Sequence, residues 1–284
     1  MLAILWNPDV VAIRIGGLAL HWYSMCWLVG LIAAYYIVKW LYRNQKTDRK
    51  LFDPLFLYCF VGVLAGGRLG HCLFYEPAYF LSSWHHFIEM LLPIQFVDGG
   101  GCIFTGYRGL ASHGGVIGML IALWLYSRHT KLTIWYVLDN IAIAAPVTAF
   151  CIRVGNLMNS EIIGRPADLP WSFVFERIDL IPRHPGMLYE ALAYAILFVV
   201  GLYIYRRQPD SVGTGYHFGL CLTWVFTARF LIEFVKEVQE AFEADMLLDM
   251  GQLLSIPFAA LGIACMVGGT WMDRLGRRKT LSQR

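Results

Sequence analysis

The chain is 284 residues long, 58% of them hydrophobic and 15% charged, with a formal net charge of +3. Its mean hydropathy of +0.54 is typical of a protein with several membrane-spanning helices rather than of a soluble domain. The small positive charge, without a basic block beside exposed aromatic residues, argues against nucleic-acid binding. Seven scattered cysteines without a C-x-x-C pair argue against a disulfide framework or a metal site.

Membrane-spanning helices need ~20 mainly apolar residues to cross ~30 Å of hydrocarbon. The N-terminal residues Met1 to Arg14 lack the basic region and cleavage site of a signal peptide, so the first apolar stretch should remain in the mature protein. No repeat or low-complexity linker divides the chain. We therefore predict an all-α polytopic membrane protein in which residues 1–284 form a single integral membrane domain. Its seven spans are expected near residues 19–41, 54–75, 110–127, 133–152, 187–205, 214–235 and 251–272.

Basic residues predict the orientation, because Lys and Arg of short loops are retained on the cytoplasmic side. The N-terminus should be outside and the C-terminus cytoplasmic. The outer segments should lie near residues 76–109, 153–186 and 236–250, and chemistry is expected on this outer face. Fourteen of the 23 basic residues lie after spans one, three, five and seven: Lys39, Arg43, Lys46, Arg49, Lys50, Arg128, Lys131, Arg206, Arg207, Arg274, Arg277, Arg278, Lys279 and Arg284.

A polar run, residues 153–161 with the sequence RVGNLMNSE, follows the fourth predicted span directly. If the helix continued, Arg153, Asn156 and Ser160 would share a face, with Glu161 about a quarter turn away. Gly155 and the asparagines make that continuation doubtful. Where hydrocarbon has just ended, these groups must satisfy one another or bind a polar ligand. The alternative is a polar cluster that only ends a helix.

Four further polar residues fall within the predicted spans. His113 precedes two glycines at the outer start of span three, where it is either a functional imidazole or a packing residue. Arg68 lies within span two and requires an anionic partner or a wet cavity. Arg229 and Glu233 are four residues apart, so they could simply neutralise each other.

Other residues carry weaker signals. His21 and Tyr23 stand at the outer end of span one and could form only an aromatic belt, whereas Tyr189 and Glu190 should face inward from span five. Residues 85–89 (HHFIE) do not form an H-E-x-x-H motif and predict an amphipathic surface helix. Glycine stripes should let helices approach closely: Gly62, Gly66, Gly67 and Gly70, and Gly114, Gly115 and Gly118.

Together these motifs resemble the prolipoprotein diacylglyceryl transferase family of bacteria. The resemblance covers residues 18 to 260 or so. The chain departs from the family pattern in three places. They are an apparent insertion, Gly101 to Gly109; Val225, where the family often has Tyr; and a short outer segment after Arg165, which implies a small periplasmic head. The motifs that carry it are, in family order, Leu20-His21-Trp22-Tyr23, Gly66-Gly67-Arg68-Leu69-Gly70, His113-Gly114-Gly115, Arg153-x-Gly155-Asn156-x-x-Asn159-x-Glu161-x-x-Gly164-Arg165, Arg183-His184-Pro185 with Leu188-Tyr189-Glu190, Arg229 with Glu233, and residues 250–257.

This resemblance implies an activity. Such an enzyme transfers the diacylglyceryl group from phosphatidylglycerol to the thiol of the lipobox cysteine of a preprolipoprotein, forming a thioether and releasing glycerol phosphate, as the first step of lipoprotein maturation. It implies a multi-pass protein of the bacterial inner membrane with its active site toward the periplasm. The expected partners are phosphatidylglycerol, the lipobox segment and the lipid bilayer, with no nucleic acid. We expect no metal and no cofactor.

The chemistry of this reaction suggests a role for each residue. A free thiol with a pKa of ~8.5 is mostly protonated at neutral pH and needs a base or a positive field. Guanidinium groups stabilise the negative charge that develops on a departing phosphate. We expect His113, Arg153, Arg229 and Tyr23 to be catalytic, with His113 as base or thiol positioner. The residues expected to bind phosphatidylglycerol are Arg153, Asn156, Glu161, Arg229, Gly164, Asn159, Arg68, His21 and Glu233.

Two other classes of function stay open from the residues alone. A transporter of anionic solutes could use Arg68, Arg153 and Arg229 as relay sites, but it predicts inverted repeats that the sequence does not display. A lipid-binding scaffold without catalysis would accommodate the same arginines.

Overall fold

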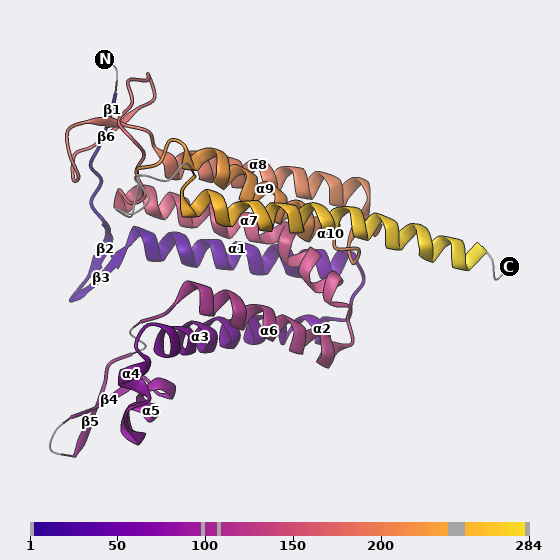
Figure 1. Cartoon of the computed structure of the whole chain (residues 1–284), viewed down its shortest axis with the longest axis horizontal. Helices are drawn as coiled ribbons and strands as arrows, with labels where there is room; N and C mark the ends of the chain where they lie inside the picture. Colours follow the sequence, from indigo (N-terminus) through magenta and orange to yellow (C-terminus); the bar gives the residue numbers. More distant parts are fainter. Residues whose placement is uncertain (1–2, 98–99, 107–108, 238–247, 282–284) are drawn as a thin grey trace. The chain divides into compact units, whose positions relative to one another are not determined.

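The computed structural model of the chain describes residues 3–97, 100–106, 109–237 and 248–281. The chain divides into two compact units: unit 1 comprises Met1–Leu41 and Leu138–Arg284, and unit 2 comprises Tyr42–Val137. Long helices dominate both units (Figure 1). That the whole chain acts as a single membrane domain stays a prediction.

Unit 1 is a bundle of long helices that pack closely at glycines. A Cβ added at Gly30 would lie 3.0 Å from the backbone of Thr148, and the Thr148 hydroxyl donates to the Gly30 carbonyl at 2.9 Å. A Cβ at Gly219 would lie 2.5 Å from the Gly262 carbonyl oxygen, so these two helices also require a small residue where they meet. The helices are α1 (Trp22–Asn44), α7 (Ile134–Asn159), α8 (Gly186–Arg207), α9 (Tyr216–Glu233) and α10 (Met250–Leu281); the end of α1 and the start of α7 belong to unit 2.

The end of unit 1 where α9 begins is fixed by a buried carboxylate on α7. Asp139 accepts hydrogen bonds from the backbone N–H groups of Gly213 at 2.8 Å, Gly215 at 2.9 Å and Phe218 at 2.8 Å. The first N–H groups of a helix have no partner within the helix. Asp139 therefore caps α9 from a neighbouring helix, and its oxygens are fully used by the fold.

Unit 2 is built on two helices packed through glycine. A Cβ at Gly70 would lie 2.8 Å from the Cα of Gly114, and one at Gly118 would lie 2.7 Å from the Cα of Gly66, which confirms the predicted role of the glycine stripes. The helix predicted around residues 85–89 is also present. The elements are α2 (Arg49–Phe52), α3 (Leu55–Phe74), α4 (Pro77–Phe80), α5 (Trp84–Leu91), β4 (Ile94–Val97), β5 (Gly101–Phe104) and α6 (Ser112–Thr130).

Short strands correct the prediction of a purely α-helical chain. One sheet joins β1 (Ile4–Trp6), β6 (Phe173–Phe175) and β7 (Pro182–Arg183), with β1 parallel to β6. The other two sheets are antiparallel pairs, β2 (Val11–Ile15) with β3 (Leu18–His21) and β4 with β5. Strands of two to five residues are too short for a periodic signal, which explains why the prediction missed them.

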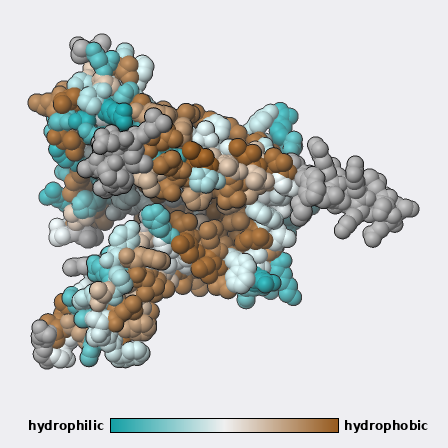
Figure 2. All heavy atoms as spheres, in the orientation of Figure 1, coloured by the Kyte–Doolittle hydropathy of each residue, from teal (hydrophilic) through white to brown (hydrophobic). Residues whose placement is uncertain are grey.

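Five helical segments of the described chain are long and apolar enough to cross a membrane. They are Trp22–Asn44, Arg49–Phe74, Ile134–Asn159, Gly186–Arg207 and Met250–Gly268. Hydrophobic residues cover much of the helical surface in Figure 2, as expected where lipid is the solvent. The chain is thus a mostly helical, polytopic membrane protein. Helices α6 and α9 coincide with the remaining two predicted spans.

Candidate functional site

The polar run after the fourth predicted span extends α7 to Asn159 instead of ending it. The helix then closes with two bonds, from Ser160 N–H to the Leu157 carbonyl at 3.1 Å and from Glu161 N–H to the Asn156 carbonyl at 3.0 Å. This is the Schellman arrangement, which places one residue in the left-handed region. That residue is Ser160, with φ of 56°, and the turn brings Glu161 back beside the last turn of the helix.

The guanidinium of Arg153 is held by a buried carboxylate. Its Nε forms an ion pair with Glu190 Oε2 of α8, and its Nη1 donates to Asn156 Oδ1 at 3.1 Å. The Glu190 side chain is 1% exposed and that of Arg153 is 21% exposed. These two contacts and a hydrogen bond to Tyr194 engage three of the five N–H donors of the guanidinium. Arg153 therefore keeps donors for a further anion on its accessible side.

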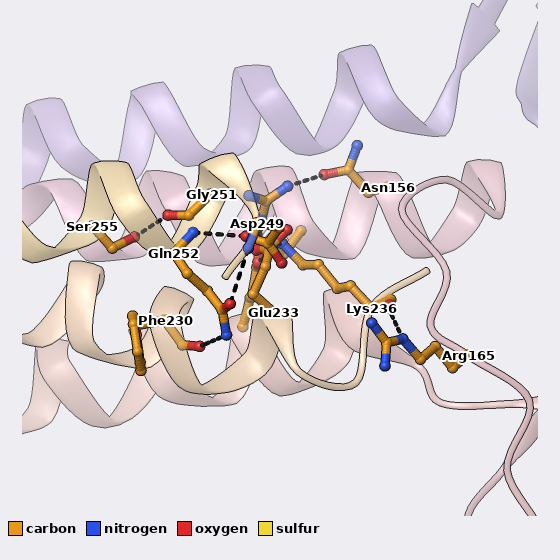
Figure 3. Close-up of polar contacts among 11 residues, drawn as sticks. Asn156, Arg165, Phe230, Glu233, Lys236, Asp249, Gly251, Gln252 and Ser255 are labelled. Carbon is orange, nitrogen blue, oxygen red and sulfur yellow. Dashed lines mark hydrogen bonds and ion pairs between the residues drawn. The ribbon is translucent and has the colours of Figure 1, made fainter. Parts of the chain in front are cut away.

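A second cation shares the same carboxylate. Lys236, just after α9, lies 2.6 Å from Glu190 Oε1 and 3.1 Å from Glu233 Oε2. Both oxygens of Glu190 are therefore satisfied by ion pairs rather than by conventional hydrogen bonds. Figure 3 shows the Lys236 side chain extending toward Glu233, with Asn156 across the cluster. Two cations and two anions balance, which allows Glu190 and Lys236 to be buried and Arg153 and Glu233 to be partly buried.

The end of α7 adds carboxamides to this ion cluster. Asn156 Nδ2 donates to Glu161 Oε2 at 2.8 Å, and Asn159 Nδ2 donates to Glu161 Oε1 at 3.1 Å. The buried atoms Asn159 Oδ1 and Ser160 Oγ have no hydrogen-bond partner among the described residues. Such atoms cost free energy unless a polar group reaches them, so this helix end is suited to a hydroxyl-bearing ligand.

Arg229 of α9 lies near the cluster without joining it. The buried Tyr194 of α8 interacts electrostatically with both Arg153 and Arg229 and also hydrogen-bonds Arg153. Arg229 itself is exposed and has no ion pair or hydrogen bond to any residue the structure describes. Glu233 pairs with Lys236 instead, so the alternative that Arg229 and Glu233 neutralise each other is wrong. Arg229 thus contributes a positive charge that no described carboxylate compensates.

The start of α10 packs against Glu233. Asp249 and Gln252 form a reciprocal capping box: Asp249 Oδ1 accepts from the Gln252 N–H at 2.7 Å, and Gln252 Oε1 accepts from the Asp249 N–H at 3.2 Å. A Cβ at Gly251 would lie 2.9 Å from the Glu233 carboxyl carbon. Glycine at 251 therefore makes room for the carboxylate that Lys236 contacts.

Backbone pairing closes the site on one side. The Gly164 N–H donates to the His184 carbonyl at 2.9 Å, and Arg165 Nε donates to the Lys236 carbonyl at 2.9 Å. A Cβ at Gly164 would lie 2.5 Å from that of His184, so Gly164 is explained by close backbone approach. Arg183 bonds Asp179 at 2.6 Å and Glu237 at 3.2 Å. Its hydrogen bonds hold the pKa of the Asp179 carboxyl below its usual range.

Two predicted residues lie on the N-terminal side of the bundle. Tyr23, in the first turn of α1, packs against Gly155: a Cβ there would lie 3.1 Å from the Tyr23 Cα. Tyr23 therefore lies beside the helical turn that carries Arg153 and Asn156. His21 is the last residue of β3 and is exposed; no described contact links it to the cluster.

The remaining predicted residues, Arg68 and His113, belong to unit 2. Arg68 Nη2 donates to the Glu89 carbonyl at 2.8 Å and its Nε to the Met90 carbonyl at 3.3 Å. Its guanidinium also lies 4.9 Å from the centroid of the Phe80 ring. His113 is exposed in the first turn of α6.

Sequence reasoning missed Glu190 and Lys236 as site residues. Glu190 was predicted to face inward, but without a partner. Lys236 was assigned to an outer connection because it follows an apolar span. A detectable signal was the lone Lys three residues after Glu233, a spacing that allows an ion pair on one helical turn.

Comparisons with known proteins identify the family of the chain. The profile of the family described as prolipoprotein diacylglyceryl transferase matches residues 10–268. A phosphatidylglycerol–prolipoprotein diacylglyceryl transferase of Bacteroides fragilis is 53% identical over 266 residues, which cover 94% of this chain and 95% of that protein. Proteins of the same name from Tolumonas auensis and Porphyromonas gingivalis are 43% and 42% identical over 93% and 92% of this chain, and over 96% and 92% of their own lengths. The chain belongs to the prolipoprotein diacylglyceryl transferase family.

Proposed function

We propose that the chain transfers the diacylglyceryl group of phosphatidylglycerol to the lipobox cysteine of a preprolipoprotein, the first step of lipoprotein maturation. The thiolate sulfur attacks the glycerol carbon that bears the phosphate ester, and a C–S bond forms as the C–O bond breaks. The phosphate takes the electron pair and leaves as glycerol phosphate. The observation that carries this proposal is the Arg153 cluster, in which Glu190 and Lys236 fix a guanidinium at the end of a membrane helix.

Arg153 and Arg229 stabilise the negative charge of the departing phosphate. As the C–O bond breaks, negative charge grows on the phosphate oxygen, and a preorganised guanidinium stabilises it more than it stabilises the substrate. Arg153 is suited to this because Glu190 and Asn156 fix its plane and leave it further donors. The exposed, positively charged Arg229 supplies the charge that the neutral cluster does not. Glu233 pairs with Lys236, which contacts Glu190 in turn, so Glu233 helps to position the Arg153 guanidinium.

The glycerol headgroup is assigned to the end of α7. Asn159 Oδ1 and Ser160 Oγ are buried and unpartnered among the described residues, and Asn156 and Glu161 lie beside them. Hydroxyl groups of a glycerol can both donate and accept hydrogen bonds, so they suit this mixed set of amides and carboxylate. Gly164 lets this turn pack closely, while Arg68 and His21 are left with supporting roles in lipid binding.

The thiol proton is assigned to His113, with Tyr23 as a support. Imidazole is the side chain whose ordinary pKa best matches proton transfer near neutral pH. A thiol needs that help because most of it is protonated at pH 7. Neither a metal ion nor an organic cofactor is needed for this displacement.

The proposal includes a topology. Seven helices, with α6 and α9 added to the five apolar ones, cross the bacterial inner membrane, with Met1 outside and Arg284 cytoplasmic. The distribution of Lys and Arg supports this orientation and places the Arg153 cluster at the periplasmic side. Cysteines introduced at Gln45 and Gln283 should react only with reagent on the cytoplasmic side, and one at Asp168 only from outside. Labelling of Asp168 from the cytoplasm alone would overturn the topology.

A mass measurement tests the reaction itself. Purified protein is incubated with phosphatidylglycerol and a lipobox peptide, and the peptide should gain one diacylglyceryl mass on its cysteine. A matched peptide with Ser in place of that cysteine should stay unmodified. A transporter of anions or a lipid-binding scaffold would add no mass, so an unmodified cysteine peptide with folded protein would refute the proposal.

A further inference from the structure

The connection between α3 and α6 in unit 2 has no part in the proposed transfer. It contains α4, α5 and the β4–β5 hairpin. Among the described residues 77–97 and 100–106, Glu89 is the one Asp, Glu, Lys or Arg, and it is 3% exposed. Its carboxylate accepts from the Tyr79 hydroxyl at 2.8 Å and from the Phe96 N–H at 2.7 Å. The described surface of α4, α5 and the hairpin therefore carries no exposed ionised carboxylate, ammonium or guanidinium group. The exposed carboxylate of Glu76 lies just before α4, beside His71.

Large apolar side chains occupy that surface instead. Phe104 is 81% exposed, Trp84 73%, Leu81 59% and Ile103 52%. Soluble surfaces rarely expose so many large apolar groups within one short connection without interspersed charge, and such exposure marks an interaction surface. A two-stranded hairpin with four residues per strand is also marginal in water by itself. Both observations indicate that something apolar covers this face.

The elements next to these exposed side chains indicate that the phospholipid bilayer covers them. These residues follow shortly after α3, which forms part of the membrane-span candidate Arg49–Phe74. The end of α3 is exposed as well, and Phe74 is 80% exposed. Exposed Tyr75 and Trp84 are of the residue types that accumulate at membrane–water interfaces. We propose that α5 and the β4–β5 hairpin insert their exposed apolar side chains into the interfacial layer of the phospholipid bilayer and anchor unit 2 there.

The outer segment of unit 1 provides a contrast. Residues 161–183 contain seven charged residues in a stretch of similar length: Glu161, Arg165, Asp168, Glu176, Arg177, Asp179 and Arg183. Yet this segment also has a highly exposed apolar side chain, Leu180 at 79%. Leu180 is therefore a matched control for Phe104, because its exposure is similar but the segment around it carries charged residues.

The test is depth-dependent fluorescence quenching. Phe104→Cys, Trp84→Cys and Leu180→Cys are each made in a Cys102→Ser background, labelled with an environment-sensitive NBD probe, and placed in nanodiscs of phosphatidylglycerol and phosphatidylethanolamine. The labelled background protein serves as the blank. Probes at 104 and 84 should emit at shorter wavelength than the probe at 180, and iodide should quench them roughly threefold less, as for side chains buried at the headgroup–acyl boundary. Doxyl groups near the headgroups should quench them more strongly.

Two results would overturn the anchor. Iodide quenching of 104 and 84 equal to that of 180 would show that the hairpin projects into water. Shielding from both iodide and doxyl lipids would show that protein, such as a bound peptide or another copy of the chain, covers the patch. Using two labelled positions keeps the test decisive if one variant fails to fold. The outcome is independent of the transfer reaction, so either proposal can fail alone.

Discussion

Two arginines in membrane helices, Arg68 and Arg153, are held in different ways. Arg68 donates to two main-chain carbonyls at the end of α5, those of Glu89 and Met90, where a cation also complements the helix dipole. Arg153 is paired with the carboxylate of Glu190, which contacts Lys236 in turn. A well-packed apolar cluster is often as stable as such a buried charge assembly. Main-chain carbonyls thus hold the guanidinium of Arg68, whereas the buried ion pairs that hold Arg153 indicate a functional site.

The largest expected effect comes from Glu190→Gln. The change keeps the shape but leaves Arg153 and Lys236 with one carboxylate fewer in a buried site, which should lower the free energy of unfolding by about 3–5 kcal/mol. Thermal unfolding in detergent measures it. Glu161→Gln is the matched control, because Glu161 is exposed and should cost less than about 1 kcal/mol. Equal shifts in the two variants would contradict the account of the cluster.

His113→Gln should reduce the rate of thioether formation by about 10²-fold or more, the range expected for losing a general base. The imidazole of His113 is exposed in the first turn of α6. Its loss should therefore leave the variant folded and inserted in the membrane. Turnover is measured at neutral pH with the protein level controlled. Near-normal turnover would return His113 to a packing role.

Two substitutions of Lys236 test whether its charge or its shape matters to the Arg153 cluster. Lys236→Met leaves Glu233 without its ion-pair partner and Glu190 paired with Arg153 alone. The resulting displacement of the Arg153 guanidinium should slow transfer by roughly 10-fold or more. Lys236→Arg keeps the charge and should recover most of that rate. The readout is the maximal rate at saturating phosphatidylglycerol. A Lys236→Arg variant as slow as Lys236→Met would show that the shape of Lys, and not its charge, is what matters.

Arg68→Lys should have the smallest effect, within about threefold in rate. Lysine keeps the positive charge and can still donate to a carbonyl at the end of α5, although it loses the planar fork. Initial rates at low and high phosphatidylglycerol measure it. A loss as large as that for an arginine of the transfer site would place Arg68 among the residues that contact substrate.

Much of the helical framework could be predicted from the sequence, because apolar length is a strong signal. Each of the seven predicted ranges overlaps a long helix. The prediction ended the fourth span too early, at residue 152, because Gly155 and the asparagines have low helix propensity. Packing overrides propensity there: Gly155 is needed because Tyr23 lies against it, and the helix continues to Asn159.

The partners of the polar residues could be predicted only in part. Arg153, Asn156 and Glu161 are neighbours on one helix end, so their spacing was informative, and the structure brings them together. Glu190 and Lys236 come from α8 and from the end of α9, and no local pattern pairs them. The parallel pairing of Ile4 with Phe173 could not be predicted either. The local sequence of a three-residue strand does not indicate a partner so distant along the chain.

Arg153→Lys provides the most direct test of the central claim, that the Arg153 cluster stabilises the departing phosphate. Thioether formation on a lipobox peptide is followed over a range of phosphatidylglycerol concentrations. Lysine keeps the charge but not the planar fork, so we expect a loss of about 3 kcal/mol, roughly 10²-fold, in the maximal rate, comparable to removing one oxyanion donor. If the contact is made in the transition state, added lipid cannot restore that rate. Full recovery at high phosphatidylglycerol, or an unchanged rate throughout, would contradict the claim.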